Sequence, residues 1–339
     1  MVTTYDDLGD DGTFEFLVRL RDYSISTIEN RAYELSLEDV TGTRFQLIVW
    51  EKATAAKDYQ WEPGQWYRLG GVTANEWPSG TVAHGATQLT IEEASGPATE
   101  PTTILYLTDS HLGKTTHTYQ GKTWAVTPSE GFQAAIDMAI ENAVTAVVHG
   151  GDCFHNAGEG IGDAETKECR DALTRLAEAG IPFYFIHGNH EEEAGKRVFQ
   201  RLCDDTLATK LGSRYEVIGN TVALYGIDHQ RKFSEYVYDF ESSAEGLQNI
   251  LCMHQSLAPF TASSNPDTTL EEVKANAGIP LELVITGHVH TRKAQLTGTQ
   301  CGIAGGATAN VGATETDLSR SVEMISANEE KITVQRCLV

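Results

Sequence analysis

The feature that most limits how this chain can fold is an apolar run that stops abruptly at metal-binding side chains. Residues 104–113 read ILYLTDSHLG, so a strand-like segment ends at Asp109 and His111. Four later segments share this design: AVVHGGDCFH, FYFIHGNHE, ILCMHQS and LVITGHVH. Open α/β sheets bind ligands where their strands end, at the carboxyl edge. The five strand ends therefore predict one composite site at the edge of an α/β sheet.

The polar residues at these strand ends suit divalent metal ions. They are Asp109, His111, Asp152, Asn189, His254, His288 and His290. Carboxylate and amide oxygens mixed with imidazoles favour Mn or Fe, and less readily Zn or Mg. Seven ligands exceed the needs of one ion, so we predict two ions about 3.5–4 Å apart that share one carboxylate. Asp152 is the natural bridge, because the preceding Gly150-Gly151 lets the backbone approach closely.

The first quarter of the chain follows a different, β-type pattern. Strands with alternating apolar residues are predicted over 13–22, 31–40, 44–52, 65–75 and 86–94. Five short strands with a longer connection after the third indicate a small closed barrel. The segments LEDVTG and PGQWYRL, with an apolar strand ending in Trp between them, resemble OB-fold domains of the single-strand-binding type.

Aromatic residues of this region have two interpretations. Such side chains can stack nucleobases on an OB surface, or they can fill the barrel core, which is the commoner outcome for any single residue. The set is Trp50, Trp61, Trp66, Tyr67 and Trp77. We expect one or two of them to be exposed for stacking, with Trp77 in the segment NEWPSG as the first choice.

From residue 104 onward, strands and helices alternate. Helices are predicted over 128–142, from Asp163 to Gly180, and over 195–202, with strands between them and a β-rich tail over 292–339. This pattern predicts a layered α/β domain. Residues 112–127 read as a long polar loop directly after the first ligands, where loops usually shape a substrate cleft.

Net charge and targeting signals indicate the salt conditions and the cellular compartment in which the protein works. The formal net charge is -23, with 48 acidic against 25 basic residues. This composition fits an ordinary acidic protein, but it favours a halophilic one, whose carboxylate surface is screened in concentrated salt. It argues against broad nonspecific nucleic-acid binding at ordinary ionic strength. The acidic N-terminus has no signal-peptide pattern and no run is long enough to span a membrane, so we expect a cytoplasmic protein.

The order of the motifs carries a resemblance to a known family. D-x-H, G-D, G-N-H-E, a lone histidine after a strand and G-H-x-H resemble the calcineurin-like metallophosphoesterases. The wording DSHLG, GGDCFH and GIPFYFIHGNHE is most similar to the SbcD/Mre-type nucleases of DNA double-strand-break repair. The implied architecture is an OB-fold-like domain over residues 1–98 followed by a layered calcineurin-like metallophosphoesterase domain over 99–339.

The resemblance also implies residue roles. One ion would be held by Asp109, His111, Asp152 and His290, and the other by Asp152, Asn189, His254 and His288. His190 would contact the scissile phosphate and protonate the leaving oxygen, and His155 matches a second active-site histidine. Glu191 replaces an Asp that the family often has, and we expect it to orient His190 or a ligand. The remaining histidines lie outside the pattern and are expected to be structural or exposed: His84, His117, His149, His187 and His229.

The implied function is phosphodiester hydrolysis of DNA by a metal-bridged hydroxide. The expected cofactors are two divalent ions, Mn foremost. The expected partner is DNA that is single-stranded or has single-stranded ends, besides a protein partner or a homodimer. Two alternatives stay open: a phosphodiesterase or phosphatase acting on a small molecule or phosphoprotein, and a proofreading exonuclease like the small subunit of polymerase D, in which an OB domain also comes first. A subunit without catalysis ranks last, because no ligand is missing.

Overall fold

The computed structural model divides into two compact units, Met1–Thr99 and Glu100–Val339. The structure describes residues 5, 14–25, 31–40, 42–50, 59–77, 80–94, 101–119, 121–155, 161–296, 298, 300–309, 319–328 and 330–339.

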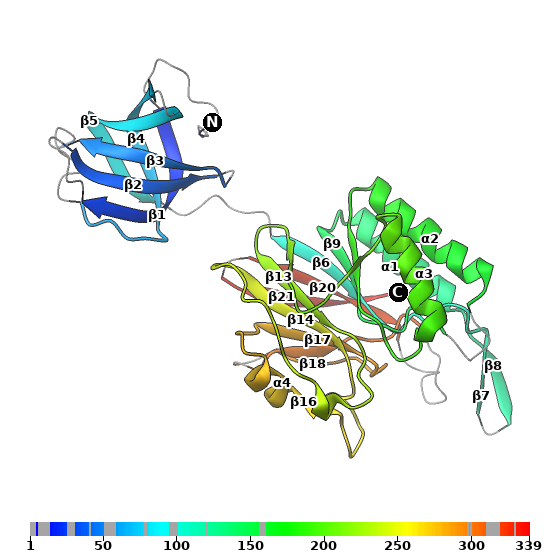
Figure 1. Ribbon diagram of the computed structural model, residues 1–339. Helices are drawn as coiled ribbons and strands as arrows, with labels where there is room; N and C mark the ends of the chain where they lie inside the picture. The colour runs from blue at the N-terminus through cyan, green and yellow to red at the C-terminus, as the bar shows by residue number, and fades with distance from the viewer. Residues whose placement is uncertain are drawn as a thin grey trace. The chain divides into compact units, whose positions relative to one another are not determined.

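The first unit is a closed five-stranded barrel (Figure 1). Its strands are β1 (Phe14–Ile25), β2 (Arg31–Asp39), β3 (Arg44–Trp50), β4 (Trp66–Trp77) and β5 (Gly80–Ala94). The order around the barrel is β1-β2-β3-β5-β4, and β3 pairs with β5 in parallel. Five strands closed in this way are the architecture of the OB fold. The predicted small all-β barrel is therefore confirmed.

The barrel core takes up part of the aromatic set. Trp61 is 4% exposed and its ring lies 5.3 Å from that of the buried Tyr67. Both residues therefore serve the core. Trp50 and Trp66 are half-buried. The backbone of Trp77 belongs to β4, and its side chain lies outside the described part of the chain.

The second unit contains two six-stranded sheets. The first has the order β11-β10-β9-β6-β20-β21. Its strands are β6 (Thr102–Leu107), β9 (Ala146–His149), β10 (Phe183–Phe185), β11 (Thr209–Lys210), β20 (Ser321–Ala327) and β21 (Ile332–Leu338). The second has the order β12-β13-β14-β17-β19-β18. Its strands are β12 (Glu216–Ile218), β13 (Val222–Ile227), β14 (Gln248–His254), β17 (Leu283–Gly287), β18 (Lys293–Gln295) and β19 (Gly302–Ala304).

Alternating side chains divide the core of this unit into layers. Along β6, Ile104 and Tyr106 belong to the cluster that fills the space between the sheets, together with Ile250 of β14. Leu105 and Leu107 point the other way and pack under the helices α1 (Pro128–Glu141), α2 (Asp163–Glu178) and α3 (Glu192–Asp204). The short α4 (Leu270–Asn276) packs against the outer face of the second sheet. The result is a helix–sheet–sheet–helix arrangement (Figure 1), so the predicted layered α/β class is also confirmed.

Helix starts follow local chemistry. Pro128 begins α1, where a missing N–H costs nothing. A capping box between Thr269 and Glu272 begins α4. The helix α3 starts at Glu192, three residues before the predicted start. Acidic residues in its first turn stabilise the helix, because negative charge is favourable at the positive end of the helix dipole. Among the described residues, no helix has the length and apolar character needed to cross a bilayer.

The segment after the first strand end departs from its prediction. Residues 112–127 were expected to form a polar loop, which is wrong in part. They contain the hairpin β7 (Thr116–Tyr119) and β8 (Lys122–Ala125), which forms a separate two-stranded sheet. A second small sheet pairs β15 (Leu257–Ala258) with β16 (Thr268–Thr269).

Candidate metal centre

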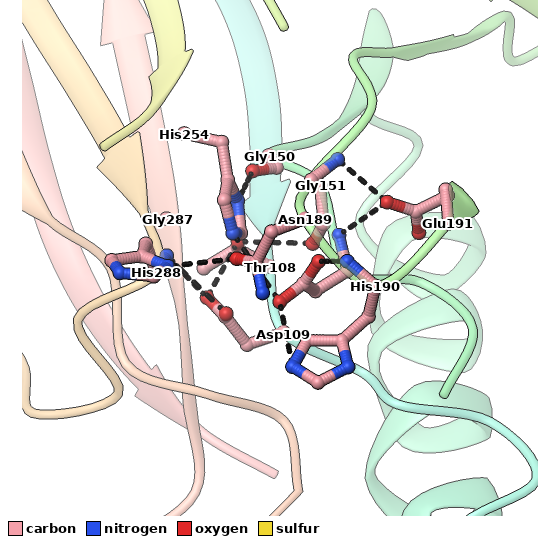
Figure 2. Close-up of polar contacts among 12 residues, drawn as sticks. Thr108, Asp109, Gly150, Gly151, Asn189, His190, Glu191, His254, Gly287 and His288 are labelled. Carbon is pink, nitrogen blue, oxygen red and sulfur yellow. Dashed lines mark hydrogen bonds and ion pairs between the residues drawn. The ribbon is translucent and has the colours of Figure 1, made fainter. Parts of the chain in front are cut away.

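The five predicted strand ends meet at one edge of the two sheets. In the first sheet, β6 and β9 run parallel and so do β9 and β10, which brings their carboxyl ends together. In the second sheet, β14 and β17 are parallel as well. Figure 2 shows Asp109, Asn189, His190, His254 and His288 converging from these ends.

One group of ligand atoms surrounds Asp109. The Oδ1 atom of Asp109 lies 3.3 Å from Nε2 of His290, and that nitrogen lies 3.3 Å from Nε2 of His111. One potential ligand atom from each of these residues lies within 4.8 Å of the others. This spacing suits a single cation.

A second group surrounds Asp152. Ligand atoms of Asp109, Asp152 and His254 also lie within 4.8 Å of one another, and Asp152 Oδ2 lies 3.3 Å from His254 Nε2. The Nδ1 atom of His288 lies 2.9 Å from Oδ1 of Asn189. Asp152 Oδ2 is also 3.9 Å from His111 Nε2, so Asp152 faces both groups. The geometry supports the bridging role proposed for it.

His254 provides a test of whether these residues fit a metal. Its Nδ1 donates to the carbonyl of Gly150 at 2.7 Å, whereas its buried Nε2 makes no well-aligned hydrogen bond and faces Asp152 Oδ2 at 3.3 Å. Metal-ligating histidines typically donate their other ring N–H to a carbonyl in this way. Burial acts to lower the pKa of His254, but the Asp152 carboxylate outweighs it and raises the pKa to about 9. A divalent cation would take the place of that proton, so the donor set fits a metal ion.

The two carboxylates are held ionised. Burial acts to raise the pKa of Asp109 and of Asp152, but neighbouring imidazoles, His290 and His254 respectively, hold both pKa values well below the usual range. Asp109 also accepts hydrogen bonds from the hydroxyl of Thr108 at 2.8 Å and from the N–H of His288 at 3.1 Å. Their charge and orientation are therefore set before any cation binds.

The backbone is strained at these ligands. Asp109, His111, Asp152 and His288 have φ values of 53°, 48°, 55° and 71°, in the left-handed region that non-glycine residues rarely adopt. Gly151 has φ +94°, and a Cβ there would lie 2.5 Å from Nδ1 of His254. Such strain concentrates at functional sites, where the surrounding fold holds it.

His190 and His155 lie on the more open side of the site. The backbone N–H of His190 donates to Asp152 Oδ1 at 2.8 Å, while its side chain is 35% exposed. The ring of His155 stacks on that of His190 at 4.9 Å, and its Nδ1 lies 3.3 Å from Nδ1 of His111. The structure thus brings together all nine predicted site residues and leaves the His190 imidazole open to a substrate.

Glu191 holds the backbone of a ligand loop. Its buried carboxylate accepts hydrogen bonds from the N–H groups of Asp152, Cys153 and Phe154 at 2.6–3.2 Å, and from that of Gly188 at 2.6 Å. Burial and the Asp152 charge raise the pKa of Glu191 to about 8, while His254 and the backbone donors act to lower it. The residue orients the backbone of Asp152 and does not bond the His190 side chain.

Replacing Glu191 by Gln should weaken metal binding about 10- to 100-fold, the usual cost of losing a group that orients ligands. The amide has one acceptor oxygen, and its own N–H groups would face the backbone donors. Calorimetric titration with Mn²⁺ measures the change. Glu193→Gln, at an 82% exposed side chain in the first turn of α3, is the matched control. Equal Mn²⁺ affinity in wild type and Glu191→Gln would contradict this role.

His149 is a buried structural histidine next to the site. Its Nδ1 accepts from the N–H of Gly151 at 3.2 Å, so its Nε2 carries the proton and donates to Ser110 Oγ at 2.9 Å. That hydroxyl also accepts from Thr308 at 2.8 Å. A second proton on Nδ1 would oppose the N–H of Gly151, and burial lowers the pKa of His149 to about 4.

This histidine should make the fold sensitive to acid. Because its pKa is about 6.5 when unfolded and about 4 when folded, the unfolded state binds the extra proton first, and stability falls as pH drops below 6.5. Between pH 7.5 and pH 5, wild type should lose about 2 kcal/mol more unfolding free energy than His149→Gln. Urea unfolding of the metal-free proteins measures this difference. Identical pH dependence would refute the assignment.

Sequence reasoning left His229 out of the site. Its ring lies 5.7 Å from that of His288 and 6.1 Å from that of His254. The strand β13 runs parallel to β14 and ends directly before Asp228-His229. The segment TVALYGIDH therefore repeats the pattern of an apolar run that stops at polar residues. This repeated pattern was the sequence signal that could have placed His229 near the site.

Comparisons with known proteins agree with this geometry. A family model described as calcineurin-like phosphoesterase matches residues 102–292. The chain is 30% identical over 239 residues to the DNA double-strand break repair protein Mre11 of Methanosarcina mazei, covering 69% of this chain and 37% of that protein. It is 30% identical over 241 residues to Mre11 of Haloferax volcanii, covering 69% and 52%. It thus spans about a third to a half of the length of these relatives.

Among solved structures, the chain is similar to the OB domain of MM0293 from Methanosarcina mazei. The identity is 21%, the TM-score is 0.25, and the match covers 28% of this chain and 85% of that domain.

Proposed function

The chain belongs to the calcineurin-like phosphoesterase family, and from this premise we propose that it is a dimetal-dependent DNA nuclease. The observation that carries the proposal is the pair of ligand groups around Asp109 and Asp152, with Asp152 facing both and the His190 imidazole beside them. We assign one ion to Asp109, His111, Asp152 and His290. We assign the other to Asp152, Asn189, His254 and His288.

Different residues of this chain have different roles in the proposed reaction. Bound divalent cations would stabilise negative charge on the phosphoryl oxygens and lower the pKa of a water nucleophile. The His190 imidazole, which is half-buried with its Nε2 3.9 Å from Asp152 Oδ2, donates a proton to the leaving oxygen. His155 stacks against it and fixes the ring plane. Glu191 holds the loop that carries Asp152, so the carboxylate keeps its position when a substrate binds.

Three observations support DNA as the substrate and manganese as the metal. The relatives at 30% identity are DNA double-strand break repair proteins by name. A barrel of the OB type, a fold that binds oligonucleotides, comes first in the chain. The mixture of carboxylate, amide and imidazole ligands suits Mn²⁺. We therefore expect DNA with single-stranded regions as the substrate, and we expect the protein to act in the cytoplasm.

A substrate panel tests the proposal. End-labelled single- and double-stranded DNA, a bis-nitrophenyl phosphodiester and a phosphopeptide are incubated with Mn²⁺, Mg²⁺ or Zn²⁺. Metal-dependent cleavage of DNA is expected. Full metal occupancy with hydrolysis of the small diester or the phosphopeptide alone would overturn it, and preferential removal of a mispaired 3′ nucleotide would instead favour a proofreading exonuclease.

The assay is run from dilute buffer to molar salt. The net charge of -23 supports a protein adapted to concentrated salt, where its acidic surface is screened. Activity and fold are expected to weaken as salt is removed.

A further inference from the structure

The hairpin β7–β8 follows directly after the ligands of the first strand end. In Figure 1 it projects away from the two sheets as a separate pair of strands. An isolated two-stranded hairpin is at best marginally stable in water. Its side chains must therefore hold the strands together, meet a partner, or do both.

The strand register gives the hairpin two different faces. His117 pairs with Trp124 and Thr118 pairs with Thr123, so the two pairs point to opposite sides. The rings of His117 and Trp124 stack at 6.0 Å with an interplanar angle of 18°, while the hydroxyls of Thr118 and Thr123 bond at 2.9 Å. Lys122 shares the side of Trp124 by the same alternation. We call His117, Trp124 and Lys122 the aromatic face of the hairpin.

The charge around the hairpin differs from that of the rest of the chain. Residues 110–129 contain two lysines and no Asp or Glu, although the whole chain carries 48 acidic residues. Lys114 lies at the base of the hairpin, where its backbone N–H donates to the carbonyl of the ligand His111 at 3.1 Å. The segment itself thus presents positive charge to an anionic chain, while Glu130, Glu165 and Glu168 of neighbouring elements line the hollow beside its base.

We propose that the aromatic face docks the single-stranded part of a DNA substrate, with a base stacked on Trp124 and a phosphate beside Lys122. The inference rests on the proposed nuclease function and deepens it. His117 is six residues beyond His111, so its Cα lies at most about 21 Å from that ligand. The stacked base would thus lie only a few nucleotides from the scissile bond. The opposite face, with Thr116, Thr118 and Thr123, offers no ring for stacking.

The first test compares Trp124→Val with Thr123→Val. Both keep a strand-forming residue, and each removes one cross-strand side-chain contact of the hairpin: the His117–Trp124 stack in one variant and the Thr118–Thr123 hydroxyl bond in the control. Trp124→Val should raise KM for a single-stranded oligonucleotide about 10-fold, with kcat little changed. Thr123→Val should match wild type, and hydrolysis of the nitrophenyl diester should be equal in all three proteins. An unchanged KM in Trp124→Val, or equal losses in both variants, would overturn the stacking role.

The second test uses salt. For single strands, each phosphate contact contributes about 0.7 to the slope of log affinity against log salt. Lys122→Gln should lower this slope by about that amount. Trp124→Val should weaken binding but leave the slope unchanged. If Lys122→Gln left the slope unchanged, the proposed phosphate contact would be wrong. If Trp124→Val weakened binding of fully duplex DNA as much as binding of single strands, the proposed preference for single strands would be wrong.

Binding separates this inference from the nuclease proposal. Fluorescence anisotropy with a labelled oligonucleotide and the Asp152→Asn protein needs no cleavage. If wild type cuts no DNA but Trp124→Val in the Asp152→Asn background still weakens binding about 10-fold, the nuclease proposal fails and the docking face stands. If wild type cuts DNA and the Trp124 variant binds the oligonucleotide normally, the nuclease proposal stands and the docking face fails. Melting temperature and Mn²⁺ affinity, measured for each variant, confirm that the hairpin changes leave the fold and metal centre intact.

Discussion

Asp152→Asn is expected to abolish DNA cleavage, with kcat/KM falling by about 10³-fold or more, because a bridging carboxylate is worth several kcal/mol to a dimetal site. Asp152 Oδ2 lies 3.3 Å from His254 Nε2 and 3.9 Å from His111 Nε2, so one side chain serves both ligand groups. Asparagine keeps the shape and can still accept the N–H of His190. It loses the charge that two cations would share.

Metal stoichiometry gives this prediction a readout besides activity. Calorimetric titration with Mn²⁺ should show two strong sites in wild type and at most one in Asp152→Asn. Asp171→Asn, an exposed residue paired with Lys167 on α2, is the matched control and should behave as wild type. If Asp152→Asn bound two ions and kept activity within tenfold, Asp152 would not be the bridge.

His190→Ala should lower kcat for DNA by about 10²- to 10⁴-fold, the range for loss of a general acid. Both Mn²⁺ sites should remain, because neither assigned ligand set includes this ring and the backbone N–H of residue 190 still donates to Asp152 Oδ1; only the 3.9 Å approach of the ring to Asp152 Oδ2 is lost. The DNA leaving group is an alkoxide that needs a proton. The side chain that would supply it is 35% exposed and faces the site.

The leaving group provides an internal control for this variant. A nitrophenolate leaves readily without protonation. His190→Ala should therefore lower kcat far less for the nitrophenyl diester than for DNA. A similar loss on both substrates would mean that His190 positions the phosphate and does not act as an acid. Calorimetry on the same protein would reveal whether a metal site had been lost instead.

Much of this fold could be predicted because strand ends leave strong local signals. Buried parallel strands such as β9 and β14 read as short apolar runs, and their polar termini mark the edge where they meet. The OB-type barrel was predictable from alternation and turn residues. The layered class follows from these local patterns, whereas the family follows from the resemblance of the motifs in their order.

Long-range and exposed features could not be predicted in the same way. The first sheet is completed by pairing between β6 and β20, which lie far apart in the sequence. The hairpin β7–β8 was missed because its exposed strands alternate polar with half-buried residues and carry no apolar period. His229 was missed because a lone histidine after a strand is ambiguous until the neighbouring strand β14 is known.

The local geometry of the site also lay beyond the sequence. The left-handed backbone at Asp109 and Asp152 belongs to residue types that tolerate this conformation but do not require it. Glu191 could be expected to orient a ligand, but its four backbone donors come from two loops that only the fold brings together.

The pairing of β6 with β20 has a consequence for how the protein is made. β6 leads into Asp109 and His111, yet its neighbour β20 begins at Ser321. At about 5–20 residues per second, the ribosome needs roughly 10–40 s to deliver that partner. Throughout this interval the apolar edge of β6 is open to other chains, as unpaired strand edges are. Completion of the ligand-bearing sheet is therefore a late event in the synthesis of this chain.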